Sequence, residues 1–204
     1  MGIEIRIYVE GGGSDKLTRS MLRRGLEEFL REPVDAARRS RASLRISVCG
    51  SRNDAHDDFR CGVRVNSGVH CILLVDSEGP VTAPSRRQHL VSRDGWDLSG
   101  VAEEQLHLMV QMMEAWLIAD KQALAMYYGK GFGANALPAR ENVEQIPKPE
   151  LESALKAATR QTQKGEYHKT RHGPELLGRI DPLRVREAAP HCERLFAALA
   201  GSEQ

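Results

Sequence analysis

The pattern of apolar and polar residues predicts three strands in the first half of the chain. Residues 3–10 (IEIRIYVE) alternate in polarity and are rich in isoleucine, as in a strand. Residues 43–50 (SLRISVCG) predict a second strand, and residues 69–76 (VHCILLVD) form a nearly continuous apolar run. Such a run is typical of a central parallel strand that is buried on both faces.

Helical spacing of apolar residues separates these strands. Residues 16–32 predict a helix with Ser14 or Asp15 as N-cap and Pro33 as its stop, and residues 53–65 predict a short helix.

The second half of the chain is mainly helical by the same criterion. We expect a loop over residues 77–100, then a strand over 106–112 and a helix to Tyr128, although one long helix over the last two segments fits the pattern as well. After Tyr128 the pattern predicts a helix over 149–162, a basic loop over 163–177, and a terminal helix over 181–199 interrupted near Pro190.

The alternation of strands and helices predicts an α/β fold with a mainly parallel, four-stranded, Rossmann-like sheet. We expect residues 1–130 to form one α/β domain. Residues 131–204 are expected to form a helical, basic extension packed on that domain. Ligands of such sheets bind beyond the carboxyl ends of the strands.

Two carboxylates end predicted strands. Glu10 closes the first strand and Asp76 the third, so neighbouring strands would bring both side chains into one crevice. Glu78 lies two residues beyond Asp76 on the same side of an extended segment. Carboxylate oxygens at this density suit Mg²⁺ or Mn²⁺, and we assign Glu10, Asp76 and Glu78 as metal ligands. A solvent-exposed turn that points Glu78 away is the alternative.

The glycines after Glu10 are a weaker signal. The segment GGGSDK has the spacing of neither common phosphate-binding motif, and a tight strand-to-helix turn explains it equally well. Its backbone N–H groups can still face a phosphate at the helix start, so we assign Gly11 and Gly12, together with Arg52, to substrate binding.

Glu114 interrupts the apolar segment VQMMEAWLIAD, which is costly for a buried carboxylate without a partner. We place Glu114 at a helix start facing the crevice and assign it a catalytic role. Asp120 falls on another helix face, where an ion pair with Arg or Lys is expected. Trp116 and Leu117 belong to an apolar stripe and are predicted to be core residues.

Charge is unevenly distributed in a chain whose net charge is only +1. Residues 16–45 carry nine Lys or Arg against four acids, whereas residues 94–120 carry six acids and no Lys or Arg. The segment KGEYHKTRHG is again basic, and its cations suit phosphates while its tyrosine suits stacking on a base. A solvent-exposed surface is an alternative explanation for each of the two basic segments. From the segment KGEYHKTRHG we assign these residues to substrate binding: Lys164, Tyr167, Lys169, Arg171 and His172.

The acidic constellation resembles the Toprim domain of topoisomerases, primases and some nucleases. There, a Glu ends the first strand and a D-x-D pair ends a later apolar strand. A finer resemblance is to a bacterial family called domain of unknown function 4276, which looks Toprim-like. It is carried by YVEGGGSDK, LLVDSEGPV, LMVQMMEAWLIAD, YYGKGF and KGEYHKTRHG.

The Toprim resemblance implies that Glu10, Asp76 and Glu78 are the metal-binding acids and that Glu114 is a further catalytic acid. It implies a metal-dependent nuclease or related phosphoryl-transfer enzyme acting on DNA or RNA, in phage defence, beside a separate ATPase subunit. Glu78 departs from the usual Asp, which keeps open a non-catalytic metal-dependent nucleotide or nucleic-acid sensor. A small-molecule phosphohydrolase using the same acids is a third possibility.

The remaining composition indicates the compartment. The four cysteines show no CxxC spacing, and a chain of 204 residues needs no disulfide scaffold, so we expect reduced thiols and a cytoplasmic protein. No apolar run is long enough to span a membrane.

Overall fold

The computed structural model describes residues 4–65 and 68–201, so Ile3, the expected first residue of the first strand, lies outside the described residues. Four parallel strands form one sheet in the order β2 (Ser43–Gly50), β1 (Glu4–Gly12), β3 (Val69–Asp76) and β4 (Leu106–Met109). The sequence-based prediction of an α/β fold with a parallel four-stranded sheet is therefore confirmed.

Helices cover both faces of the sheet because strand residues alternate between two hydrophobic clusters. Ile5, Ile7 and Val9 of β1 join the cluster that α1 (Lys16–Phe29) and α10 (Pro190–Gly201) help to form, and α2 (Arg31–Arg39) packs against β2 and both of these helices. On the other face, Tyr8 packs near α3 (Arg52–Val65), with its ring 6.1 Å from that of Phe59.

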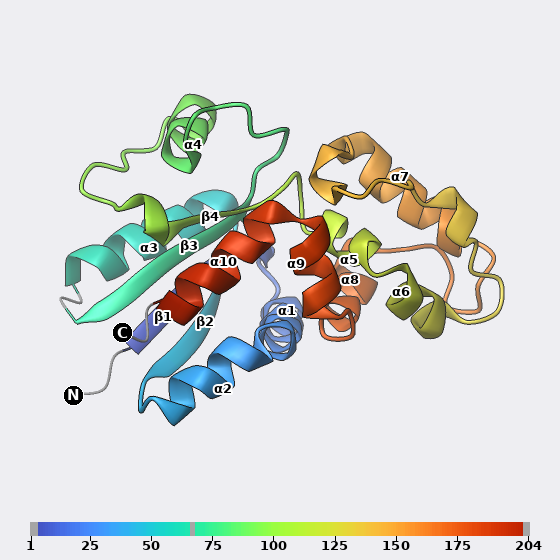
Figure 1. Ribbon diagram of the computed structural model, residues 1–204, viewed down its shortest axis with the longest axis horizontal. Helices are drawn as coiled ribbons and strands as arrows, with labels where there is room; N and C mark the ends of the chain where they lie inside the picture. Colours follow the sequence, from blue (N-terminus) through green and yellow to red (C-terminus); the bar gives the residue numbers. More distant parts are fainter. Residues whose placement is uncertain (1–3, 66–67, 202–204) are drawn as a thin grey trace.

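The remaining helices lie mainly beyond the carboxyl ends of the strands, where Figure 1 shows α5 to α8 grouped together. Their bounds, with those of α4 and α9, are α4 Arg86–Asp94, α5 Glu114–Ala119, α6 Lys121–Tyr128, α7 Lys148–Thr159, α8 Lys169–Leu177 and α9 Pro182–Ala188. Three short 3-10 turns complete the described elements: Glu103–Gln105, Ala134–Ala136 and Val143–Gln145.

One shared core joins the two halves of the chain. Trp116 is fully buried and stacks on Phe29 with ring centroids 5.2 Å apart, while Phe29 meets Phe196 of α10 at 5.7 Å. Leu117 is buried in the same cluster, so the predicted core role of both α5 residues is confirmed.

Several predicted elements need correction. The expected loop after Asp76 contains α4, which Ser85 caps by accepting a hydrogen bond from the backbone of Gln88 and which ends at the left-handed Gly95. Pro33 does not end the helical region, because it lies in the first turn of a separate helix, α2. Asp120 splits the helix expected to reach Tyr128 into α5 and α6.

The expected basic loop over 163–177 contains α8, despite Gly173 and Pro174 within it. Its packing against α1 explains why. Gly25 of α1 leaves the space that the carbonyl oxygen of Pro174 fills, since a Cβ there would lie 2.2 Å from that oxygen. Tertiary packing therefore outweighs the local helix-breaking signals.

The strand predicted over 106–112 ends at Met109, but the remaining cap, break and cysteine predictions agree with the structure. Asp15 caps α1 through the backbone of Leu17 and Thr18, and the terminal helix is indeed divided before Pro190. All four cysteines are free, and only Cys61 among them is exposed.

Within the described residues, no helix combines the length and apolar character that crossing a membrane requires.

Candidate metal and phosphate site

Glu10 and Asp76 lie at the carboxyl ends of neighbouring strands, as expected from the sequence. The register of β1 against β2 becomes irregular after Val9, where Gly50 faces three successive residues of β1. Gly11 has φ of 141° and Gly12 has φ of 74°, both favouring glycine, so this turn depends on them. The glycine segment thus sets the position of the Glu10 carboxylate.

Arg52 connects the two strand ends. Its guanidinium donates to Glu10 Oε2 at 2.9 Å and to the backbone oxygen of Asp76 at 2.5 Å. It also binds both carboxylate oxygens of Asp94, at 2.9 and 2.8 Å, and lies 5.0 Å from the ring centre of Trp96. Arg52, assigned above to substrate binding, is therefore engaged in holding the site together.

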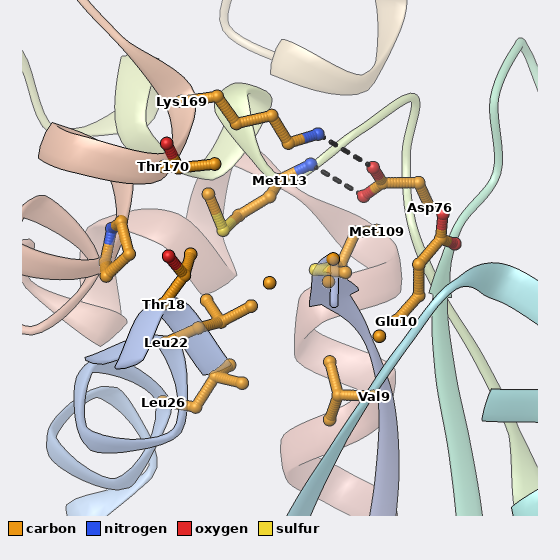
Figure 2. Close-up of a pocket in the computed structure, with 15 residues that line it drawn as sticks. Val9, Glu10, Thr18, Leu22, Leu26, Asp76, Met109, Met113, Lys169 and Thr170 are labelled. Carbon is orange, nitrogen blue, oxygen red and sulfur yellow. Dashed lines mark hydrogen bonds and ion pairs between the residues drawn. The ribbon is translucent and has the colours of Figure 1, made fainter. Parts of the chain in front are cut away.

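Asp76 and Glu114 share one lysine. Asp76 Oδ1 accepts a hydrogen bond from the backbone of Met113 at 2.9 Å, and its Oδ2 lies 3.5 Å from Lys169 Nζ (Figure 2). The same ammonium lies 3.7 Å from Glu114 Oε2. Strand β3, the start of α5 and the start of α8 thus bring three charged groups together, and Glu114 stands at a helix start as predicted.

Glu114 is held in an unusual environment. Its side chain is 0% exposed, and Oε1 accepts a hydrogen bond from the hydroxyl of Tyr167 at 2.9 Å. Oε2 is buried without a hydrogen-bond partner, apart from the longer ion pair with Lys169. Glu114 Oε2 can therefore still accept a cation or a proton.

Glu78 lies nearby but faces other cations. It is hydrogen-bonded to Lys148, and its Oε2 lies 3.7 Å from Arg93 Nη2. Its backbone is left-handed, with φ of 65°, and its N–H donates to the carbonyl oxygen of Gln111 at 2.8 Å. Glu78 therefore stands in a separate ion-pair group next to the Glu10 and Asp76 carboxylates.

The electrostatics distinguish these acids. Burial, reinforced by repulsion between neighbouring carboxylates, raises the pKa of Glu10, Asp76 and Glu114. Partial burial opposes ionisation of Glu78, but the hydrogen bond and charge of Lys148 outweigh it and lower that pKa. Burial also opposes the charge on Lys169, yet Asp76 and Glu114 raise its pKa above its usual value. The buried carboxylates therefore attract positive charge.

This donor set fits a hard divalent cation. Three carboxylates, those of Glu10, Asp76 and Glu114, offer oxygen ligands of the kind that Mg²⁺ and Mn²⁺ prefer. The ammonium of Lys169 already stands between two of them, and Glu114 Oε2 lacks a hydrogen-bond donor. As the side chains stand, no three His, Cys, Asp or Glu in residues 4–65 and 68–201 form a metal-holding group.

The segment assigned to phosphate binding divides between the site and the surface. Lys169 points at the carboxylates, whereas Lys164 lies 4.6 Å from the ring centre of Tyr127 and Arg171 is exposed. Tyr167 and His172 are buried, and His172 Nδ1 pairs with the hydroxyl of Tyr128 at 3.1 Å. The ring of Tyr167 is thus packed inside, where its hydroxyl positions Glu114.

Other site contacts had weaker signals in the sequence. Asp94 and Lys148 were not identified as site residues, and each reaches the site from a distant element. Asp94 precedes the helix-ending Gly95 and Lys148 precedes Pro149, so both carried only a helix-boundary signal. Asp120 has the expected role of ion-pair partner, 3.8 Å from Arg184, and also caps α6.

A comparison with protein-family models gives one match, described as Domain of unknown function (DUF4276), over residues 9–200. No curated protein and no solved structure matches the chain. The matched range includes every carboxylate of the site.

Proposed function

The chain belongs to the family described as Domain of unknown function (DUF4276), and we propose that it is a divalent-metal-dependent phosphoryl-transfer enzyme, a nuclease acting on DNA or RNA. The observation that carries this proposal is the meeting of Asp76, Glu114 and Lys169 beside Glu10 at the carboxyl edge of a parallel sheet. The placement of Glu10 and Asp76 at adjacent strand ends also supports a Toprim-like site.

In this proposal Glu10, Asp76 and Glu78 would hold a divalent ion, which would supply Lewis-acid activation of the phosphate. The chain's own groups do the positioning. Arg52 holds Glu10, and the backbone N–H of Met113 holds Asp76, so both carboxylates present a fixed oxygen. Lys169 binds a phosphate oxygen and offsets its charge, as cations aimed at a transferring phosphoryl group do.

Glu114 suits the role of general base. Its buried Oε2 accepts a proton from water, while the hydrogen bond from Tyr167 holds the other oxygen in place. Burial raises its pKa, which moves a carboxylate toward the range where a general base works efficiently near neutral pH.

A second candidate is a non-catalytic metal-dependent nucleotide or nucleic-acid sensor. The engagement of Glu78 with Lys148 and Arg93 favours it, because these cations compete with any metal for that carboxylate. The Toprim resemblance also leaves two further predictions, a role in phage defence and a separate ATPase subunit. Co-purification of the chain with such an ATPase would test the second of these.

The experiment compares cleavage of plasmid DNA, single-stranded DNA and RNA, with Mn²⁺ and with chelator. Asp76→Asn should abolish the Mn²⁺-dependent products. The matched control is Asp120→Asn, which alters another buried, capping aspartate outside the site and should retain activity. Metal-dependent binding without cleavage would favour the sensor, and cleavage unaffected by Asp76→Asn would contradict the proposed site.

A further inference from the structure

A cavity of about 250 Å³ opens beside the acidic cluster, and its two sides differ in chemistry. Glu10, Asp76 and Lys169 form one side, next to the glycine turn. The rest of the lining is largely apolar and includes Val9, Leu22, Leu26, Met109, Met113 and Pro174. In Figure 2, Leu22 and Leu26 lie across the cavity from Glu10 and Asp76.

The packing of the glycine turn explains why the cavity begins directly at the strand end. A Cβ on Gly11 would lie 2.5 Å from Leu22 Cδ2, and one on Gly12 would lie 2.8 Å from Arg19 Cα. The turn therefore sits against α1 as closely as glycine allows. The apolar wall and the carboxylates are brought within the span of one small ligand.

The size and polarity of the cavity restrict its occupant. Pockets for drug-sized ligands measure about 300–1,000 Å³, so this cavity suits one group of a substrate. With a divalent cation on the carboxylates, as proposed above, its walls suit a molecule with an anionic end and an apolar, planar end. Methionine sulfur makes favourable contacts with aromatic rings, and Met109 and Met113 both line the wall.

We propose that this cavity binds the base of a single unpaired nucleotide whose phosphate lies against Glu10, Asp76 and Lys169. This inference rests on the function proposed above and specifies its substrate, because a base stacked in a duplex cannot enter such a cavity. The enzyme then acts at a chain end, at a single strand or on a base turned out of the stack.

Recognition in this cavity is expected to be tolerant of base identity. The hydroxyl of Thr18 donates to Asp15 at 2.5 Å, and that of Thr170 pairs with His168 Nδ1 at 3.2 Å. Both threonine hydroxyls on the wall are thus already engaged. The contacts to the base are mainly apolar, and stacking or packing of that kind accepts every base.

The test is calorimetric titration of the chain with AMP and with ribose 5-phosphate, both in Mn²⁺. We expect AMP to bind at least about 10-fold more tightly, the effect of packing one base against side chains. Thr18→Trp fills the cavity and should remove this difference, whereas Thr18→Ala loses only the hydroxyl and should keep it. Leu17→Trp adds the same ring one residue away at a position 68% exposed, and should also keep it.

Thr170→Trp provides a second filling variant, at another exposed position that lines the cavity, should Thr18→Trp fail to fold. Equal affinity for AMP and ribose 5-phosphate in the unaltered chain, no binding of either, or an unchanged AMP preference in a folded filling variant would overturn the inference. A base preference without Mn²⁺-dependent cleavage would leave the pocket standing and contradict the nuclease proposal. Mn²⁺-dependent cleavage without a base preference would support the nuclease proposal and contradict the base pocket.

Discussion

Two tyrosine–glutamate pairs lie at or near α8, and their surroundings differ. Tyr167 donates to Glu114 at 2.9 Å inside the site, and Tyr127 donates to Glu175 at 2.9 Å on the outer surface. Burial raises the pKa of Glu114. For Glu175 the slight burial acts in the same direction, but hydrogen bonds from Tyr127 and Arg179 outweigh it and lower the pKa.

The comparison shows that geometry alone does not make a functional carboxylate. In the outer pair, the surroundings of Glu175 favour the ionised form of its carboxylate. The inner carboxylate is held where its charge is disfavoured, and perturbed groups of this kind concentrate at functional sites. Cations supplied by the chain, chiefly Lys169, offset part of that cost.

The largest effect should be on stability, from removing the Trp116 side chain two residues after Glu114 of the inner pair. Trp116→Ala leaves a cavity next to Phe29 in the shared core and should lower the free energy of unfolding by about 3–5 kcal/mol. Denaturant unfolding measures this. Met126→Ala, at a side chain 78% exposed, should change it by less than about 0.5 kcal/mol. Unchanged unfolding of Trp116→Ala with lost activity would reverse the assigned roles.

The next effect is on activity at the strand ends. Asp76→Asn keeps an oxygen for the backbone N–H of Met113 but removes the charge, and should lower the cleavage rate by more than about 100-fold. Losses of 10–100-fold are typical of residues that only support metal ligands. Single-turnover cleavage in Mn²⁺ measures the rate. A loss below about 10-fold would mean that Asp76 is not a metal ligand.

A smaller effect tests the two pairs directly, through stability against pH in chelator. A raised folded pKa means that the contribution of Glu114 is fully present below its unfolded pKa of about 4.3 and is lost as pH rises through the folded value. The stability of the unaltered chain relative to Glu114→Gln should therefore fall as pH rises above about 4.3. The total loss of stability is about 1.4 kcal/mol for each unit by which the folded pKa of Glu114 exceeds the unfolded pKa.

Glu175→Gln is the matched control and should show the opposite sign. The lowered pKa of Glu175 gives stability that is present above its unfolded pKa and is lost as pH falls through the folded value. Thermal unfolding across the same pH range measures both variants. Parallel profiles for the two substitutions would show that the inner and outer pairs are electrostatically alike.

The smallest effect concerns cations on the outer side of α8. Neutralising Lys164 and Arg171 together should reduce the salt dependence of nucleic-acid binding by about 0.7–0.9 per lost phosphate contact, equally for all sequences. Filter binding over a salt series measures the slope. Arg45→Gln, on β2, is the control and should leave it unchanged. If the double variant retains the full slope, these two cations form solvated surface and do not contact phosphate.

How far the sequence predicts the site depends on the kind of signal. Glu10 and Asp76 follow strand patterns, so their meeting at one edge was predictable once the strands were parallel neighbours. The pairing of Glu78 with Lys148 joins residues 70 positions apart, and no local pattern encodes it.

The segment of α8 shows the opposite case. Gly173 and Pro174 indicated a loop, but the fit of Pro174 against Gly25 makes it helical and packs Tyr167 and His172 inside. Among the residues that were assigned to substrate binding from its basic composition, Lys169 does face Asp76. The packing of α8 against α1 determines which of its residues face solvent, and the sequence pattern does not show this packing.

The central claim is that the strand-end carboxylates bind a divalent cation, and calorimetric titration with Mn²⁺ tests it most directly. The account predicts saturable binding to the unaltered chain and to Asp120→Asn, and loss of that binding in Asp76→Asn and in Glu10→Gln. No saturable binding, or equal Mn²⁺ affinity in all four proteins, would contradict it.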